Sequence, residues 1–171
     1  ILGNAGNDSI TAVGSNNTVY GGSGSDSFYF ADSALTSVLL AGNQDNDTVR
    51  VFVGSTATSM WGGSGEDSVQ IASNGTGYYL SGDLGNDTID VTASLLNSTI
   101  ATGAGDDRLY MTGTLNAGSV VGGSGGDSLN FVQNVSGSTV LGDADNDTIV
   151  FTETITNTSV EGGAGTDSIR L

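Results

Sequence analysis

A six-residue motif that ends in aspartate recurs along the whole chain, and this repeat restricts the fold more than any local pattern does. Its clearest copies read Gly-Gly-x-Gly-x-Asp and occupy residues 21–26, 62–67, 122–127 and 162–167. With the looser copies included, the motif aspartates are Asp8, Asp26, Asp47, Asp67, Asp87, Asp107, Asp127, Asp147 and Asp167. Successive motif aspartates are 18, 21 and then, six times, 20 residues apart. The chain is therefore a tandem array of units of about 20 residues.

Two apolar patterns flank each motif aspartate. After the aspartate, apolar residues alternate with other residues, as in Phe28 and Phe30, which indicates a short strand with one buried face. A second apolar column lies seven residues before each aspartate and marks a strand that enters the motif: Val19, Leu40, Met60, Leu80, Ile100, Val120, Val140 and Val160. Between the two strands we expect a variable loop in which one position is apolar in several units: Leu95, Leu115, Val135 and Ile155.

No unit can bury its few apolar side chains alone, so successive units are expected to stack as the coils of a solenoid. The sequence predicts an all-β fold, a right-handed parallel β-solenoid of about 8–9 coils of about 20 residues, with two short strands per coil. The composition does not shift along the chain, so we expect a single domain over residues 1–171. Both ends fall inside a repeat, which indicates an excerpt of a longer chain.

The charge balance excludes several classes of protein. The chain has 19 acidic residues against three basic ones, a net charge of -16, and it contains neither His nor Cys. A chain this negative is not expected to bind nucleic acid or an anionic membrane surface. No run of apolar residues approaches the length that spans a bilayer, so no membrane insertion is expected. Without imidazole or thiol groups, the usual zinc sites and His- or Cys-based catalysis are excluded.

Stacked coils place the motif aspartates one above another, about 5 Å apart. Two carboxylates at that separation repel each other by about 1 kcal/mol in water and by about 3 kcal/mol at an effective dielectric constant of 20. A column of such charges opposes folding unless cations lie between its members. Glycines let loop carbonyls turn inward, and carbonyl and carboxylate oxygens are the ligands that Ca²⁺ prefers. We therefore predict several Ca²⁺ ions in one column along one side of the solenoid, with the nine motif aspartates as metal ligands.

The motif, followed by x-apolar-x, resembles the repeats-in-toxin (RTX, haemolysin-type) calcium-binding β-roll repeat. This resemblance implies Ca²⁺ held between successive loops by the aspartates and by loop carbonyls, export of an unfolded chain and folding outside the cell. The usual coil of that family carries two calcium loops, whereas each coil here carries the motif on one side only. One calcium column is therefore expected. The chain also resembles, more loosely, cyanobacterial surface-fibril proteins built from such repeats.

Together these features predict a secreted calcium-binding structural repeat protein at the cell surface, as part of an extracellular fibril, surface layer or adhesin. Self-association is the expected partner interaction, with glycans or proteins of a cell surface as further partners. Outward apolar side chains are candidate contacts: Tyr20, Tyr29, Trp61, Tyr79, Tyr110, Val121, Leu141 and Val150. The alternatives are the calcium-binding repeat module of a secreted enzyme or toxin, and a phage tail-fibre solenoid.

Three other interpretations explain these residues less well. A metal-free β-helix, in which turn aspartates only form hydrogen bonds, does not explain aspartate at all nine positions. A glycosidase carboxylate pair could be drawn from Asp106 and Asp107, but these residues belong to the repeating loop, so we predict no enzyme. Some RTX-like solenoids bind ice through ladders of Thr and Asn, but the third motif position, which reads Ala5, Ser23 and Gln44 in the first three loops, forms no regular lattice.

Overall fold

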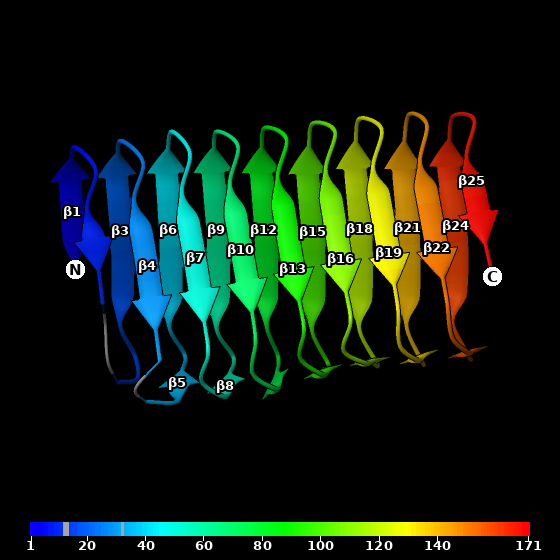
Figure 1. Ribbon diagram of the computed structural model, residues 1–171, viewed down its shortest axis with the longest axis horizontal. Coiled ribbons are helices and arrows are strands. Elements are labelled where there is room, and N and C mark those ends of the chain that lie inside the picture. Colours follow the sequence, from blue (N-terminus) through cyan, green and yellow to red (C-terminus); the bar gives the residue numbers. More distant parts are fainter. Residues whose placement is uncertain (12–13, 32) are drawn as a thin grey trace.

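The computed structural model describes residues 1–11, 14–31 and 33–171. Within these ranges the regular structure consists of strands only, and all strand pairs are parallel. The strands stack as coils along one axis, and the two termini lie at opposite ends of the resulting rod (Figure 1). The described residues contain no helix long and apolar enough to cross a membrane. The predicted all-β parallel solenoid is therefore confirmed.

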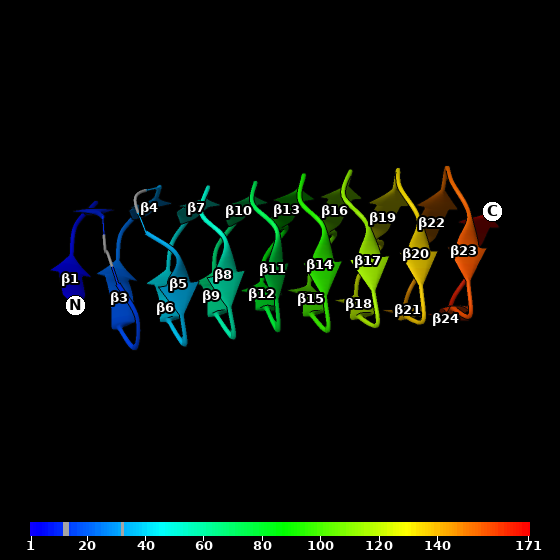
Figure 2. The ribbon, with the colours of Figure 1, turned by 90° about the horizontal axis from the view of Figure 1, so that it is seen from below.

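From residue 27 onward, each complete coil visits three sheets in turn (Figures 1 and 2). One strand runs into the aspartate motif, the next leaves it, and a third, two-residue strand lies at the opposite end of the coil. We call the three sheets the entry sheet, the exit sheet and the third sheet. The motif loops form the edge at the top of Figure 1, and the third sheet forms the edge at the bottom.

The strands of each sheet recur with the period of the motif. The entry sheet contains β1 (Leu2–Ala5), β3 (Thr18–Ser23), β6 (Leu39–Gln44), β9 (Ser59–Ser64), β12 (Tyr79–Leu84), β15 (Thr99–Ala104), β18 (Ser119–Ser124), β21 (Thr139–Ala144) and β24 (Ser159–Ala164). The exit sheet contains β2 (Ser9–Ile10), β4 (Ser27–Phe30), β7 (Thr48–Val51), β10 (Ser68–Ile71), β13 (Thr88–Val91), β16 (Arg108–Met111), β19 (Ser128–Phe131), β22 (Thr148–Phe151) and β25 (Ser168–Arg170). The third sheet contains β5 (Leu35–Thr36), β8 (Ser55–Thr56), β11 (Gly75–Thr76), β14 (Leu95–Leu96), β17 (Leu115–Asn116), β20 (Val135–Ser136) and β23 (Ile155–Thr156).

The register pairs equivalent positions of neighbouring coils. Leu80 of β12 pairs with Ile100 of β15, and Ile89 of β13 pairs with Leu109 of β16. Equivalent positions of the repeat therefore lie in columns along the rod. Where the side chain of one coil points into the core, the equivalent side chain of the next coil points into the core as well. This is why the periodic apolar positions of the sequence become one continuous core.

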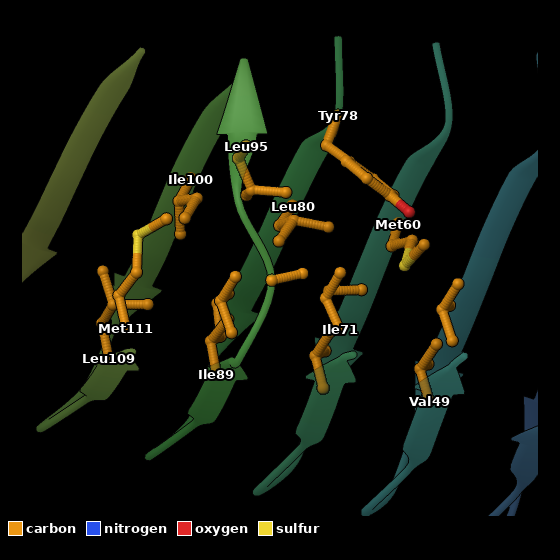
Figure 3. Close-up of a cluster of buried hydrophobic side chains, with 14 of the residues drawn as sticks. Val49, Met60, Ile71, Tyr78, Leu80, Ile89, Leu95, Ile100, Leu109 and Met111 are labelled. Carbon is orange, nitrogen blue, oxygen red and sulfur yellow. The ribbon is translucent and has the colours of Figure 1, made fainter. Parts of the chain in front are cut away.

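The core lies between the three sheets, and its side chains point toward one another (Figure 3). Both apolar columns predicted from the sequence are buried through the middle of the rod, where Leu80, Ile89 and Ile100 are 0% exposed. In the last coil the burial falls off, because β25 lies at the end of its sheet. Ile169, which belongs to the same column as Ile89, is 42% exposed there.

The third sheet corrects one prediction, because the connection expected to be a loop contains a short strand. Leu95 and Leu115 pair across it, and both side chains are buried. A two-residue strand is too short to show alternation in the sequence, so periodicity could not reveal it. Where this column is interrupted by Gly75, the ring of Tyr78 fills the space that a larger side chain would need, and it extends toward Met60 of the preceding coil (Figure 3).

Candidate metal centre

The nine motif aspartates lie in one column, at the turn where each entry strand passes into an exit strand. Seven of them are buried, with between 1% and 3% of the residue exposed: Asp26, Asp47, Asp67, Asp87, Asp107, Asp127 and Asp147. Asp8 and Asp167, in the two terminal coils, are partly buried. The structure thus brings all nine predicted site residues to the same place in their coils.

In every motif aspartate from Asp26 to Asp167, one carboxylate oxygen joins two coils. The backbone N–H of Asp26 donates to Oδ1 of Asp47 over 2.7 Å, and the backbone N–H of Asp147 donates to Oδ1 of Asp167 over 3.0 Å. The same bond connects every pair of successive motif aspartates along the rod. Hydrogen bonds to an ionised carboxylate are stronger than neutral ones, so this ladder fixes the register of the loops.

The second carboxylate oxygen is different. In eight of the nine motif aspartates, from Asp8 to Asp147, Oδ2 is buried and has no hydrogen-bond partner among the residues that the structure describes. It points across the loop at the first residue of its own motif. A Cβ atom built on Gly62, for example, would lie less than 3 Å from both Oδ2 of Asp67 and the carbonyl oxygen of Gly82 in the next coil. Two hydrogen-bond acceptors therefore converge on one space, which we call the loop hollow.

The loop hollow recurs because the first motif residue is nearly always glycine. Equivalent Cβ atoms would meet Oδ2 and a carbonyl of the next coil at Gly3, Gly21, Gly42, Gly82, Gly122 and Gly142. Glycine is needed here for space.

At the fourth motif position, in contrast, the backbone is left-handed, and Asp45 and Asp145 replace glycine there with φ angles of 69° and 78°. Asp tolerates this region better than most residues do.

Burial makes the ionised form of these aspartates unfavourable in the protein alone. It raises the pKa of Asp47, Asp87 and Asp127 to about 7. The N–H group bonded to each carboxylate opposes this rise in pKa, and neighbouring carboxylates add to it. Burial also raises the pKa of three further motif aspartates: Asp67, Asp107 and Asp147. A bound cation would reverse this preference, because it stabilises the charged carboxylate.

The residues present fit a hard cation with oxygen ligands. Across the described ranges, no three Asp or Glu side chains lie close enough together to hold a metal ion by themselves. Any ion in the column must therefore be completed by carbonyl oxygens, and each loop hollow supplies one beside an unpartnered carboxylate oxygen. Calcium takes six to eight such oxygens in flexible geometry. The metal-free interpretation accounts for the Oδ1 ladder but leaves the buried Oδ2 atoms without a partner.

The carboxylates considered as a glycosidase pair, Asp106 and Asp107, differ in their surroundings, because Asp107 is buried in the column and Asp106 lies beside it on the motif loop. Asp106 is exposed, and its Oδ1 accepts a hydrogen bond from the backbone of Gly126 over 2.8 Å. Arg108 turns away from it, since its guanidinium lies 3.8 Å from Asp90 and 5.2 Å from the ring centroid of Tyr110. A surface pocket of about 510 Å³ lies over the third sheet, and its described lining residues, such as Thr56 and Thr76, include no ionisable side chain.

One motif position escaped the sequence analysis. Thr102 stands where the other eight motifs begin with glycine, and it is fully buried. The signal was available, because a single substitution in an otherwise constant position is visible once the motifs are aligned. The Oδ1 ladder, in contrast, has no sequence signature beyond the aspartate itself.

Fold and site together define a class of protein, the parallel β-solenoid with a buried aspartate column at one turn. The family profile of the RTX calcium-binding nonapeptide repeat matches four copies in this chain, over residues 1–32 and 96–110. The same motif continues in the loops outside these segments. The predicted resemblance to this repeat is therefore confirmed over these segments, and the parallel β-solenoid is consistent with it along the described chain. No curated protein and no solved structure matches the chain significantly.

Proposed function

We propose that this chain is a secreted structural element of an extracellular fibril, surface layer or adhesin, and that calcium drives its folding. In this proposal Ca²⁺ ions occupy one column along the motif edge, held by Oδ2 of the motif aspartates and by loop carbonyls. The observation that carries it is the row of eight buried Oδ2 atoms for which the described structure offers no donor. An unsatisfied buried acceptor costs about 1–3 kcal/mol, and more when it is charged.

Calcium control also suits a secreted chain. With a net charge of -16, the chain repels itself when it is compact, and its buried column adds to that cost. Without calcium the chain is then expected to stay unfolded, which is compatible with export. Outside the cell, the free energy of calcium binding becomes free energy of folding. The protein accordingly functions as a rod that forms only where calcium is plentiful.

A second copy of the chain is the proposed partner, and the outer face of the entry sheet is the proposed contact. One outward column of that face consists almost entirely of uncharged side chains: Leu2, Tyr20, Ala41, Trp61, Ser81, Ala101, Val121, Leu141 and Glu161. Trp61 contacts Tyr79, with ring centroids 5.6 Å apart. The corresponding column of the exit sheet contains Arg50, Asp90 and Arg170. An apolar column is the better surface for side-by-side packing of rods that share a negative charge.

The test is folding and assembly with and without calcium. In chelator the purified chain should give the circular dichroism spectrum of a disordered polypeptide, and millimolar Ca²⁺ should restore a β-type spectrum. Electron microscopy of the calcium-loaded protein, or of native material, should then show uniform filaments or sheets. A spectrum that chelator leaves unchanged would contradict the calcium part of the proposal. Calcium-loaded chains that stay monomeric at all concentrations would contradict the assembly part.

A further inference from the structure

Thr102 occupies the loop hollow in one coil of the rod. Its side chain is 0% exposed, and its hydroxyl donates a hydrogen bond to the carbonyl oxygen of Gly122 over 2.8 Å. Gly122 is the first residue of the next motif, so the bond spans two neighbouring coils at the metal column. The other eight motifs begin with glycine and have no side chain at this position.

The hydroxyl group is placed where the other coils have two facing acceptors. In the coil before, a Cβ atom on Gly82 would lie less than 3 Å from Oδ2 of Asp87 and from the next carbonyl oxygen. Thr102 carries a real Cβ, a methyl group and a hydroxyl at the equivalent position. The hydroxyl proton goes to the carbonyl of Gly122, and Oδ2 of Asp107 keeps no partner among the described residues. One of the two acceptors that face the loop hollow in the other coils is therefore already bonded here.

We propose that Thr102 takes the place of a calcium ion in the loop hollow between the Asp107 and Asp127 motifs. This inference rests on the proposed function, in which calcium in the other hollows is held by Oδ2 and a facing carbonyl. Calcium needs six or more oxygens at 2.3–2.6 Å. At Thr102 the side chain fills part of that volume, and its hydroxyl proton already engages the carbonyl that would be a ligand. The chain therefore binds one ion fewer than a chain with glycine at every first position.

The position of Thr102 also divides the column. Motif aspartates up to Asp107 lie on one side of this contact, and Asp127, Asp147 and Asp167 lie on the other. A solenoid is coupled mainly between nearest neighbours, so a metal-independent contact stabilises only the two coils that share it. When calcium is withdrawn, we expect these two coils to separate after the calcium-dependent contacts on either side.

The experiment counts bound calcium in matched variants of the whole chain, by native mass spectrometry and by equilibrium dialysis with Ca²⁺ alone. Thr102→Gly, which restores the common motif, should bind one more ion than the wild type. Gly142→Thr should bind one fewer, because it places the same side chain in a different loop hollow. Thr102→Val keeps the hollow filled but removes the donor, so it should leave the count unchanged and lower the thermal midpoint. Thr99→Gly, in the same strand but partly exposed, is the control and should leave the count unchanged.

The outcomes separate this inference from the proposed function. A wild-type chain that folds without binding any calcium overturns the proposed function and, with it, the role of Thr102. A wild-type chain that binds calcium while Thr102→Gly binds the same number overturns the role of Thr102 alone. Should Thr102→Gly fail to fold, the Gly142→Thr variant decides, since an unchanged ion count in that variant also contradicts the proposal.

Discussion

Asp87 is bonded to Asp67 across the boundary between two coils, because the backbone N–H of Asp67 donates to Oδ1 of Asp87 over 2.7 Å. The other oxygen of Asp87 points across its own loop toward Gly82, into the loop hollow that it shares with the carbonyl of Thr102 in the next coil. A single carboxylate therefore contacts the coil before it by a hydrogen bond and is available to a cation together with the coil after it. Both contacts depend on one side chain.

Replacing Asp87 should accordingly damage two coil boundaries. Asp87→Ala removes the acceptor of the Asp67 N–H and the carboxylate ligand of the next hollow. We expect the loss of at least one bound calcium and a loss of unfolding free energy several times that of a surface substitution, which is usually within about 0.5 kcal/mol. Because coupling is local, the unfolding transition should split and should not disappear. Calcium stoichiometry and thermal unfolding, measured side by side, check this.

The matched control for that variant is Asp90→Ala. Asp90 lies three residues on in β13, outside the column, and its side chain is 42% exposed beside Arg108. An exposed ion pair contributes little to stability, so the control should keep its calcium and its thermal midpoint. Equal effects of the two substitutions would show that the column carries no special role.

The pH dependence should have opposite signs with and without calcium. Burial raises the pKa of Asp47, Asp87 and Asp127 to about 7, above the ordinary value of 3.8. Between these values the folded, calcium-free chain binds more protons than the unfolded chain, so its stability falls as the pH rises. The calcium-free chain should therefore be most stable near pH 4 and least stable above pH 7.

Calcium reverses that trend, because the ion binds the ionised carboxylates and competes with protons. In saturating calcium, stability should fall as the pH is lowered through the same window. Circular dichroism from pH 4 to pH 8 checks both signs: in calcium-depleted buffer the folded fraction, absent near pH 7, should grow toward pH 4, whereas in calcium it should fall toward pH 4. Parallel curves would mean that protons and calcium do not compete for the column.

How far the sequence predicted this structure depends on whether a feature is periodic. The positions of Ile89 and Leu109 could be predicted, because a fixed period places equivalent residues one above another whatever the details of the loops. The nine motif aspartates fell into one column for the same reason. The two-residue strands of the third sheet could not be predicted, since they are too short to show a pattern.

The hydrogen bonds of the aspartate column could not be predicted from the sequence. The backbone N–H of Asp67 reaches one oxygen of Asp87 because of the way in which neighbouring coils are displaced relative to each other. No residue type encodes that displacement. The role of Thr102 likewise depends on which way its hydroxyl points. The motif predicted which side chains could hold a metal, and the structure shows that one oxygen of each motif aspartate from Asp26 to Asp167 already accepts a backbone N–H.

Calcium should stabilise the rod far more than magnesium does. The hollows offer carboxylate and carbonyl oxygens on loops of variable backbone, which suits the irregular coordination of Ca²⁺, whereas Mg²⁺ demands a tight octahedron and keeps its waters. An ion present at 100 times its Kd contributes about 2.7 kcal/mol per site. The thermal midpoint should thus rise steeply in millimolar Ca²⁺ and only slightly in equal Mg²⁺. The same midpoint in both ions would mean that the loops respond to charge alone.

Assembly should depend on the entry sheet and not on the exit sheet. The aromatic pair Trp61 and Tyr79 lies on the outer face of the entry sheet, and Tyr79 is 37% exposed. A second aromatic pair, Tyr29 and Phe52, has ring centroids 5.5 Å apart, with Tyr29 on the exit sheet and Phe52 directly beyond the end of β7. Tyr29 pairs with Arg50, so the second pair lies on the column that has charged members. The two pairs therefore form a matched comparison of the two faces.

We expect the double variant Trp61→Ser and Tyr79→Ser to abolish or strongly reduce calcium-dependent association, because it removes an aromatic pair from the outer face of the entry sheet. The double variant Tyr29→Ser and Phe52→Ser should associate like the wild type, since charges interrupt its face. Both should bind wild-type amounts of calcium, as none of the four side chains belongs to the motif or to the aspartate column. Sedimentation velocity in calcium over a range of protein concentrations measures the difference. If the second variant loses association while the first retains it, the rods pack through the exit sheet, and the contact proposed for the entry sheet is wrong.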